Sequence, residues 1–142
     1  MPHTEYEVRQ AEHHAGRGEI CAQISTGAVK LLSEYTGRGP TKAHTIMNRE
    51  SVTIVLRDTL TKGERSLVAG GKQEEVKRSR YAYQQVMGEE LTALVEEAVE
   101  RKVIAFLSAN HLDPDVAVEF FLLEPEPESH NGESHNGNSA SV

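Results

Sequence analysis

The sequence contains one cysteine, Cys21, and no tryptophan. A lone thiol excludes a disulfide within the chain, which is typical of proteins that work in a reducing compartment. The sequence also lacks an excess of basic residues, since 15 Lys and Arg stand against 22 Asp and Glu and the net charge is −7. Neutralising phosphates dominates the affinity for nucleic acid, so an acidic chain without a basic stripe predicts no nucleic-acid partner.

Long hydrophobic runs are missing as well. No apolar stretch approaches the roughly 20 residues of a transmembrane helix. The N-terminal residues lack the basic and apolar regions of a signal peptide. We therefore expect a cytoplasmic protein that does not insert directly into a membrane.

The 142 residues suit one domain with polar ends. Residues 1–18 are polar and contain two glycines, which indicates a flexible leader with some helix from Glu5. Residues 125–142 are rich in Pro, Glu, Ser and Asn, and the motif Glu-Ser-His-Asn-Gly occurs twice there, at 128–132 and 133–137. That composition cannot bury apolar surface and predicts a disordered tail. The folded domain is expected to span 19–124.

The first half of that domain reads as a helix followed by a hairpin. Residues 19–36 carry apolar side chains at helical spacing, and Gly37 with Pro40 ends the pattern. Residues 41–48 and 51–57 then read as two strands, because apolar and polar residues alternate along the second of them.

The second half repeats that order. Thr61 and Glu64 form a capping box, which predicts a helix start. The helical pattern continues through Lys102, with a possible kink at the glycines 70 and 71, and strands are expected over 103–109 and 116–123. The resulting α-ββ-α-ββ order predicts an α+β fold with a four-stranded, mainly antiparallel sheet packed on a long helix.

The last strand is apolar on both faces. A sheet covered by helices on one face alone should be polar on the other, so a second element or a second subunit is expected to cover it. The sequence leaves two candidates for this cover, the N-terminal helix and another copy of the chain. The sequence predicts a homo-oligomer, with an oligomer face drawn from Val118, Phe120, Phe121 and Leu123.

Several short motifs resemble the MpsC family, formerly a domain of unknown function. They are Gly37-Arg38-Gly39-Pro40, Val52-Thr53-Ile54-Val55-Leu56, Leu60-Thr61-x-x-Glu64, and Phe106-Leu107-Ser108 followed by Asp113-Pro-Asp. The resemblance covers roughly residues 19–124. It implies a small soluble bacterial protein without established chemistry, linked by name to a sodium-translocating, membrane-potential-generating system. It carries over no active-site residues and no cofactor, and it leaves a membrane-protein partner as an expectation.

The loop Gly37–Pro40 is the candidate site for a ligand or a partner. An arginine between two glycines has few local packing partners, so we expect Arg38 to be displayed. Arg57 is a possible neighbour, and two arginines can together bind a carboxylate or a phosphate. The simpler interpretation is a helix stop followed by a turn.

Other candidates have ordinary explanations. His111, Asp113 and Asp115 carry metal-ligating groups, but they straddle a proline turn, so we expect no metal site. The histidines at 13, 14, 130 and 135 lie in segments expected to be flexible. Cys21 is expected to be a small packing residue. The sequence indicates no catalytic residues and no cofactor.

The sequence thus favours a non-enzymatic cytoplasmic binding or accessory protein, associated with a membrane ion or inorganic-carbon transport system. The alternative is a ligand- or anion-sensing regulatory protein, or a small enzyme, with a pocket at a subunit boundary. A concave pocket with convergent polar groups would favour the alternative, and a wide apolar surface would favour the binding protein.

Overall fold

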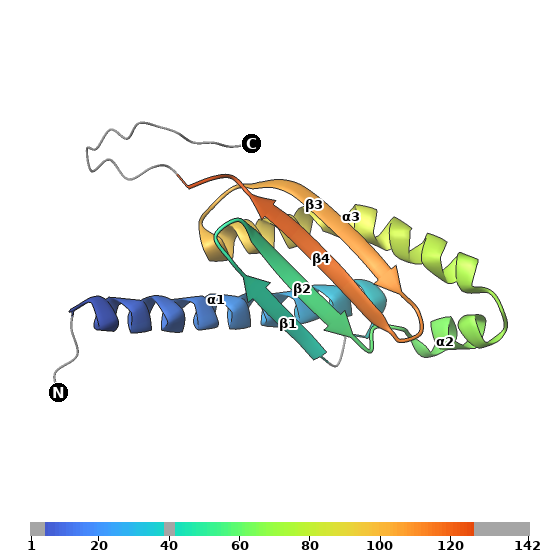
Figure 1. The fold of residues 1–142 in the computed structure, drawn as a ribbon. Helices are drawn as coiled ribbons and strands as arrows, with labels where there is room; N and C mark the ends of the chain where they lie inside the picture. Colours follow the sequence, from blue (N-terminus) through green and yellow to red (C-terminus); the bar gives the residue numbers. More distant parts are fainter. Residues whose placement is uncertain (1–4, 39–41, 127–142) are drawn as a thin grey trace, which may run out of the picture.

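The computed structural model describes residues 5–38 and 42–126 (Figure 1). Three helices and four strands follow one another in the order α1(Glu5–Thr36), β1(Lys42–Met47), β2(Ser51–Arg57), α2(Lys62–Ala69), α3(Gln73–Val99), β3(Val103–His111) and β4(Val116–Leu123). The predicted α+β class and the four-stranded sheet are confirmed, and the strand order is β1-β2-β4-β3 with every neighbouring pair antiparallel.

The helices lie behind the sheet in the view of Figure 1, with α1 across β1 and β2 and α3 across β4 and β3. The core therefore fills the space between one sheet face and these two helices. Its fully buried members come from α1, β2, α3 and β4, and they include Ile24, Ile54, Leu91 and Phe121, each 0% exposed. The prediction of a sheet packed on a long helix is confirmed, and the packing uses two long helices.

Helix α1 begins at Glu5, where the sequence indicated some helix within the leader, and it runs without a break into the predicted helix 19–36. Gly16 and Gly18 lie inside it without ending it. Glycine lowers helix propensity by about 1 kcal/mol relative to alanine, which weakens a helix but does not forbid one. That residues 1–18 form a flexible leader stays a prediction.

Two glycines with positive φ shape the helix ends. Gly37 follows α1 with φ +76°, and Gly71 separates α2 from α3 with φ +79°. The predicted kink at residues 70 and 71 is therefore a full break into two helices, since the left-handed conformation cannot continue an α-helix. The predicted capping box is confirmed: the Thr61 hydroxyl accepts from the Glu64 amide, and the Glu64 carboxylate accepts from the Thr61 amide.

Gly88 has a packing role near the middle of α3. A Cβ built on this residue would lie 3.2 Å from a ring carbon of Phe106 in β3. The missing side chain thus allows α3 to approach the edge of the sheet, and the Phe106 ring in turn stacks against Phe121 with centroids 5.0 Å apart.

Candidate functional site

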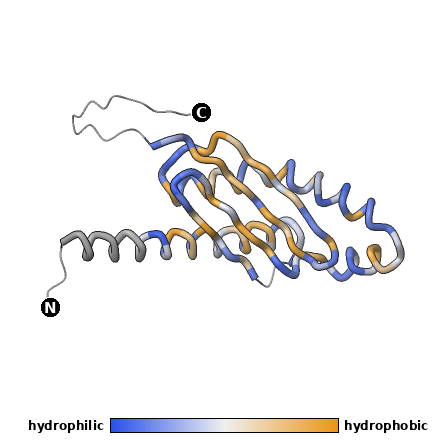
Figure 2. Tube along the Cα trace, viewed as in Figure 1, coloured by the Kyte–Doolittle hydropathy of each residue, from blue (hydrophilic) through white to orange (hydrophobic). Residues whose placement is uncertain are grey.

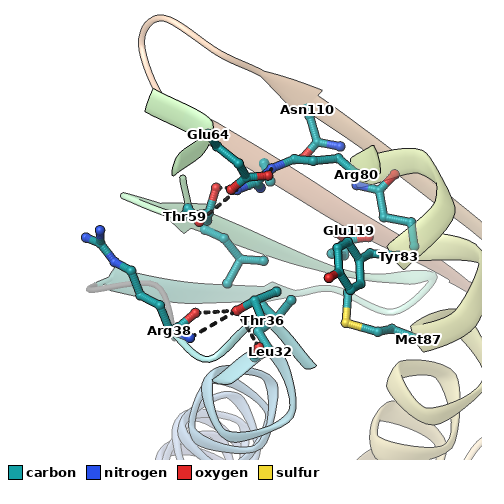
Figure 3. A pocket seen from close by; sticks show the side chains of 13 residues that line it. Leu32, Thr36, Arg38, Thr59, Glu64, Arg80, Tyr83, Met87, Asn110 and Glu119 are labelled. Carbon is teal, nitrogen blue, oxygen red and sulfur yellow. Dashed lines mark hydrogen bonds and ion pairs between the residues drawn. The ribbon is translucent and has the colours of Figure 1, made fainter. Parts of the chain in front are cut away.

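A small cavity opens between the two helices and the middle of the sheet (Figure 3). Its volume is about 40 Å³, enough for a few water molecules or a ligand of similar size. The walls come from the end of α1, from β2 and its exit, from α2, from α3 and from β4. The polar residues among them are Thr36, Arg38, Thr59, Glu64, Arg80, Tyr83, Gln84, Asn110 and Glu119.

Glu119 is the most unusual of these residues. It lies on β4 among the core-facing side chains and is 2% exposed, yet its Oε2 atom has no hydrogen-bond partner among the described residues. Two other buried oxygens without a partner lie next to it, Oγ of Ser108 and Oδ1 of Asn110. Ser108 is the direct cross-strand neighbour of Glu119. Asn110 is opposite Ala117, which lies on the same face of β4 as Glu119. Glu119, Ser108 and Asn110 therefore all lie on the helix side of the sheet.

Burial raises the pKa of Glu119 to about 7, while the nearby Ser108 hydroxyl and the positive charge of Arg80 act in the opposite direction. The cause is desolvation, because a carboxylate moved out of water loses its hydration. A carboxyl group with a pKa near neutral can release or take up a proton under ordinary conditions. Perturbed groups of this kind also occur more often at functional sites than elsewhere.

Arg80 closes the cavity on the side of α2. Its Nε and Nη2 atoms donate to the two Glu64 oxygens at 3.1 and 2.9 Å, and Nη1 and Nη2 donate to the hydroxyl and carbonyl of Thr59 at 2.7 Å each. Burial acts to raise the pKa of Glu64, but hydrogen bonds from Arg80 and Thr61 hold it below its usual value. This forked pair fixes the start of α2 against α3.

Asp115 extends the same network to the start of β4. Its carboxylate accepts from the Thr59 hydroxyl at 2.8 Å and from the Leu60 amide at 2.9 Å. The Nδ1 atom of His111 lies 2.8 Å from the Pro114 carbonyl oxygen. These contacts brace the turn, and no cluster of three or more metal-ligating residues occurs in the part of the chain that the structure describes.

Arg38 is not displayed as the sequence suggested. It is half-buried, lines the cavity, and donates from Nη1 to the Leu60 carbonyl at 3.1 Å. The reason is that Gly37 turns the chain back toward the exit of β2. Arg57 is exposed and belongs to the opposite face of the sheet, so the two arginines do not converge on one ligand. Gly39 and Pro40, the rest of the predicted site, lie outside the described residues.

The other face of the sheet carries no helix in the described chain, and Figure 1 looks onto it. We call this surface the open face. Strand alternation and register place on it the apolar residues Ile46, Val55, Ala105, Leu107, Ala109, Val116, Val118, Phe120 and Leu122, and the polar residues Lys42, His44, Ser51, Thr53, Arg57 and His111. Figure 2 shows that β4 and much of β3 are apolar, whereas β1 mixes apolar and hydrophilic residues. Ile46 and Leu107 are 50% and 63% exposed, so a wide apolar surface faces solvent.

The predicted oligomer face divides between the two sides. Val118 and Phe120 lie on the open face, whereas Phe121 and Leu123 are 0% and 3% exposed and belong to the core under the helices. The four residues divide in this way because neighbouring residues of a strand point to opposite faces of the sheet. Neither alternation nor composition shows from sequence which face is the covered one.

Glu119, Arg80 and Thr59 were missed at the sequence level. A glutamate inside an apolar strand, Val-Ala-Val-Glu-Phe-Phe, was the available signal for Glu119. Arg80 has no comparable signal, since it lies in a helix with charges on most turns. Cys21 is half-buried, and burial raises the pKa of its thiol, which fits the predicted packing role.

The fold and this cavity define a small α+β protein with a helix-covered face and an open face. The model of a protein family described as "Na+-translocating membrane potential-generating system (MpsC)" matches residues 16–125. That match covers most of the chain, and the protein belongs to the MpsC family, as the sequence motifs indicated. No curated protein and no solved structure matches the chain.

Proposed function

We propose that this protein is a non-enzymatic cytoplasmic accessory protein that works by binding a protein partner through the open face, and that it does so as a homo-oligomer. The observation that carries the proposal is the open face itself. A four-stranded sheet in water should be polar on its uncovered side, but the centre of this one presents Val55, Val118 and Phe120. Soluble proteins rarely expose contiguous apolar surface of this kind unless it is an interaction site.

The class of partner follows from the family. The family description names a sodium-translocating, membrane-potential-generating system. No helix in the described ranges is long and apolar enough to cross a membrane. We therefore propose that the chain attaches to a membrane ion or inorganic-carbon transport system through another protein.

The Glu119 cavity favours a second candidate function, a small-ligand sensor or a small enzyme. Unpaired buried oxygens and a raised carboxyl pKa are the features expected of such a site. The cavity described here lies within one chain, whereas the sequence placed the alternative pocket at a subunit boundary. The small volume favours a bound water or proton over a metabolite-sized ligand.

Co-purification at native expression level tests the main proposal. Val118→Asp places a charge in the centre of the open face, and Val86→Asp places the same charge on α3, where Val86 is 61% exposed. Both variants must first show wild-type circular dichroism and similar melting temperatures. The proposal expects membrane-protein partners to be lost from Val118→Asp and kept by Val86→Asp, and equal recovery from both would contradict it.

A further inference from the structure

The outer edge of β3 is an unprotected strand edge. The strand has nine residues, and within the described chain it has a strand neighbour on one side only, β4. Its sequence Val-Ile-Ala-Phe-Leu-Ser-Ala-Asn-His contains no proline, lysine, arginine or acidic residue. Ile104 and Leu107 are 52% and 63% exposed. Edge strands present unpaired backbone groups, and proteins normally protect them with charge, proline, a β-bulge or short length. The register of β3 against β4 shifts between Val103 and Ala105, so the regular part of this edge is 105–111.

The opposite edge of the same sheet shows that protection. Strand β1 has six residues, begins with the exposed Lys42 and carries the exposed His44. The Thr45 side chain is buried under α1, where its hydroxyl lies 2.7 Å from that of Ser25. The contrast indicates that β3, rather than β1, is the edge suited to pairing.

The helix layer beside Phe106 of β3 carries several polar, uncharged residues and one acidic residue. A groove between α3 and Phe106 runs beside β3 and is lined by Gln84, Gln85, Gly88, Glu89 and Thr92. Tyr81, which is 64% exposed, continues the spacing Tyr81, Gln85, Gly88, Thr92 along one side of α3. Acidic and basic residues crowd much of the remaining exposed surface of this helix. The acidic groups beside β3 are Glu89 in the groove and Glu96, whose carboxylate accepts from the Val103 amide at 2.8 Å.

We propose that two copies of this chain pair antiparallel through their β3 strands, with the two-fold axis at Leu107. The pairing joins two four-stranded sheets into one continuous sheet. On the open face, Leu107 meets Leu107 of the second copy, and Ala105 meets Ala109 of the second copy. On the helix side, Phe106 meets Ser108 of the second copy.

A second copy is favoured over another chain because the strand is complementary to itself. Under the two-fold axis, every pair named above is uncharged, so no like charges lie opposite one another. Each chain carries a net charge of −7, so two copies repel unless they meet at a surface without acidic residues. Residues 105–109 of β3 carry no charge, although Glu89 lines the adjoining groove.

Gly88 supports the same geometry from the helix layer. It lies against Phe106, one residue from the proposed axis, so the two α3 helices would be closest to each other near their glycines. The groove beside Phe106 has room for side chains of the added strand. The inference rests on the self-association in the proposed function, but it does not depend on the membrane partner or on what covers the open face.

Cysteine cross-linking tests the register directly. In the full chain carrying Cys21→Ser, Leu107→Cys puts one thiol opposite another at a Cα separation of about 4.5–5.5 Å, which a disulfide can span. We expect most of this variant to become a covalent dimer under mild oxidation. Ile46→Cys, which lies on the same face at the β1 edge and is also exposed, should stay monomeric on a non-reducing gel. Ala105→Cys and Ala109→Cys should cross-link when mixed and far less when oxidised separately.

Solution mass gives an independent readout. At tens of micromolar we expect light scattering to report two chains for the wild type and for Ile46→Lys, and one chain for Leu107→Lys, with wild-type circular dichroism throughout. A monomeric wild type overturns the inference together with the proposed self-association. A dimer that cross-links through Ile46→Cys, or that fails to cross-link through Leu107→Cys, overturns the edge pairing alone and leaves the proposed function standing.

Discussion

Glu119 and Ser108 lie opposite each other across β4 and β3 on the helix side of the sheet, and neither Glu119 Oε2 nor Ser108 Oγ has a hydrogen-bond partner within residues 5–38 and 42–126. A buried carboxyl group next to a cavity, with an unpaired oxygen, is costly when it is ionised. The fold keeps it at the point where α3 crosses the sheet. Its titration should therefore be visible in the stability of the whole domain.

The first prediction concerns pH. The pKa of Glu119 is about 7 in the folded protein, against an ordinary value of 4.5. Between these two values the folded state binds more protons than the unfolded state, so the free energy of unfolding falls as pH rises and levels off above pH 7. This rise in pKa corresponds to a change of at most about 3 kcal/mol in the free energy of unfolding. Urea unfolding from pH 4.5 to 8 measures it.

Glu119→Gln is the matched variant, because it keeps the shape and cannot ionise. We expect its stability to lack this fall and to exceed that of the wild type above pH 7. Parallel pH profiles for the two proteins would show that Glu119 does not titrate in this range.

The second prediction concerns the stability of an Arg80 variant. Removing it by Arg80→Ala leaves the Glu64 carboxylate without its forked partner and Thr59 without two hydrogen bonds. Breaking one side of a largely buried pair costs about 3–5 kcal/mol. Urea or thermal unfolding at pH 7 should show a loss of that order. Lys77→Ala, which removes an exposed helix charge paired with Glu74, should change stability by less than about 0.5 kcal/mol, and equal losses would contradict the network.

The sequence indicated the backbone of this fold well but the site poorly. The capping box joins Thr61 and Glu64, which are three residues apart, so the sequence alone predicts it. The alternation of buried and more exposed side chains in β2 is predicted from the sequence in the same way. Arg38 was misjudged because its partner, the Leu60 carbonyl, is 22 residues away in sequence. The network around Arg80 depends on which strand lies beside which, and strand order cannot be read from periodicity.

The third prediction concerns the stability of the variant Arg38→Ala. Because Arg38 donates to a backbone carbonyl from a half-buried position, its loss should reduce stability by about 0.5–1.5 kcal/mol. Arg57→Ala removes an exposed arginine and should stay within about 0.5 kcal/mol of the wild type. Chemical denaturation of both variants checks this, and an unchanged midpoint for Arg38→Ala would mean that the hydrogen bond contributes nothing.

The polar tail supplies the fourth test. Deleting residues 127–142 should leave the melting temperature nearly unchanged, because a segment of that composition has little apolar surface to bury. The deletion keeps Glu126, whose carboxylate lies 3.5 Å from Arg101. A loss of several degrees in a calorimetric scan would show that the tail docks on the domain.

Photo-cross-linking in cells tests the central claim, binding through the open face, most directly. A photoreactive phenylalanine analogue is placed at Phe120 on the open face or at Tyr83 on α3, where the side chain is 41% exposed, and adducts are identified at native expression level. The account predicts adducts with a membrane-protein partner from position 120 and none from position 83. Adducts with that partner from position 83 alone, or no adducts with another protein from position 120, would contradict it.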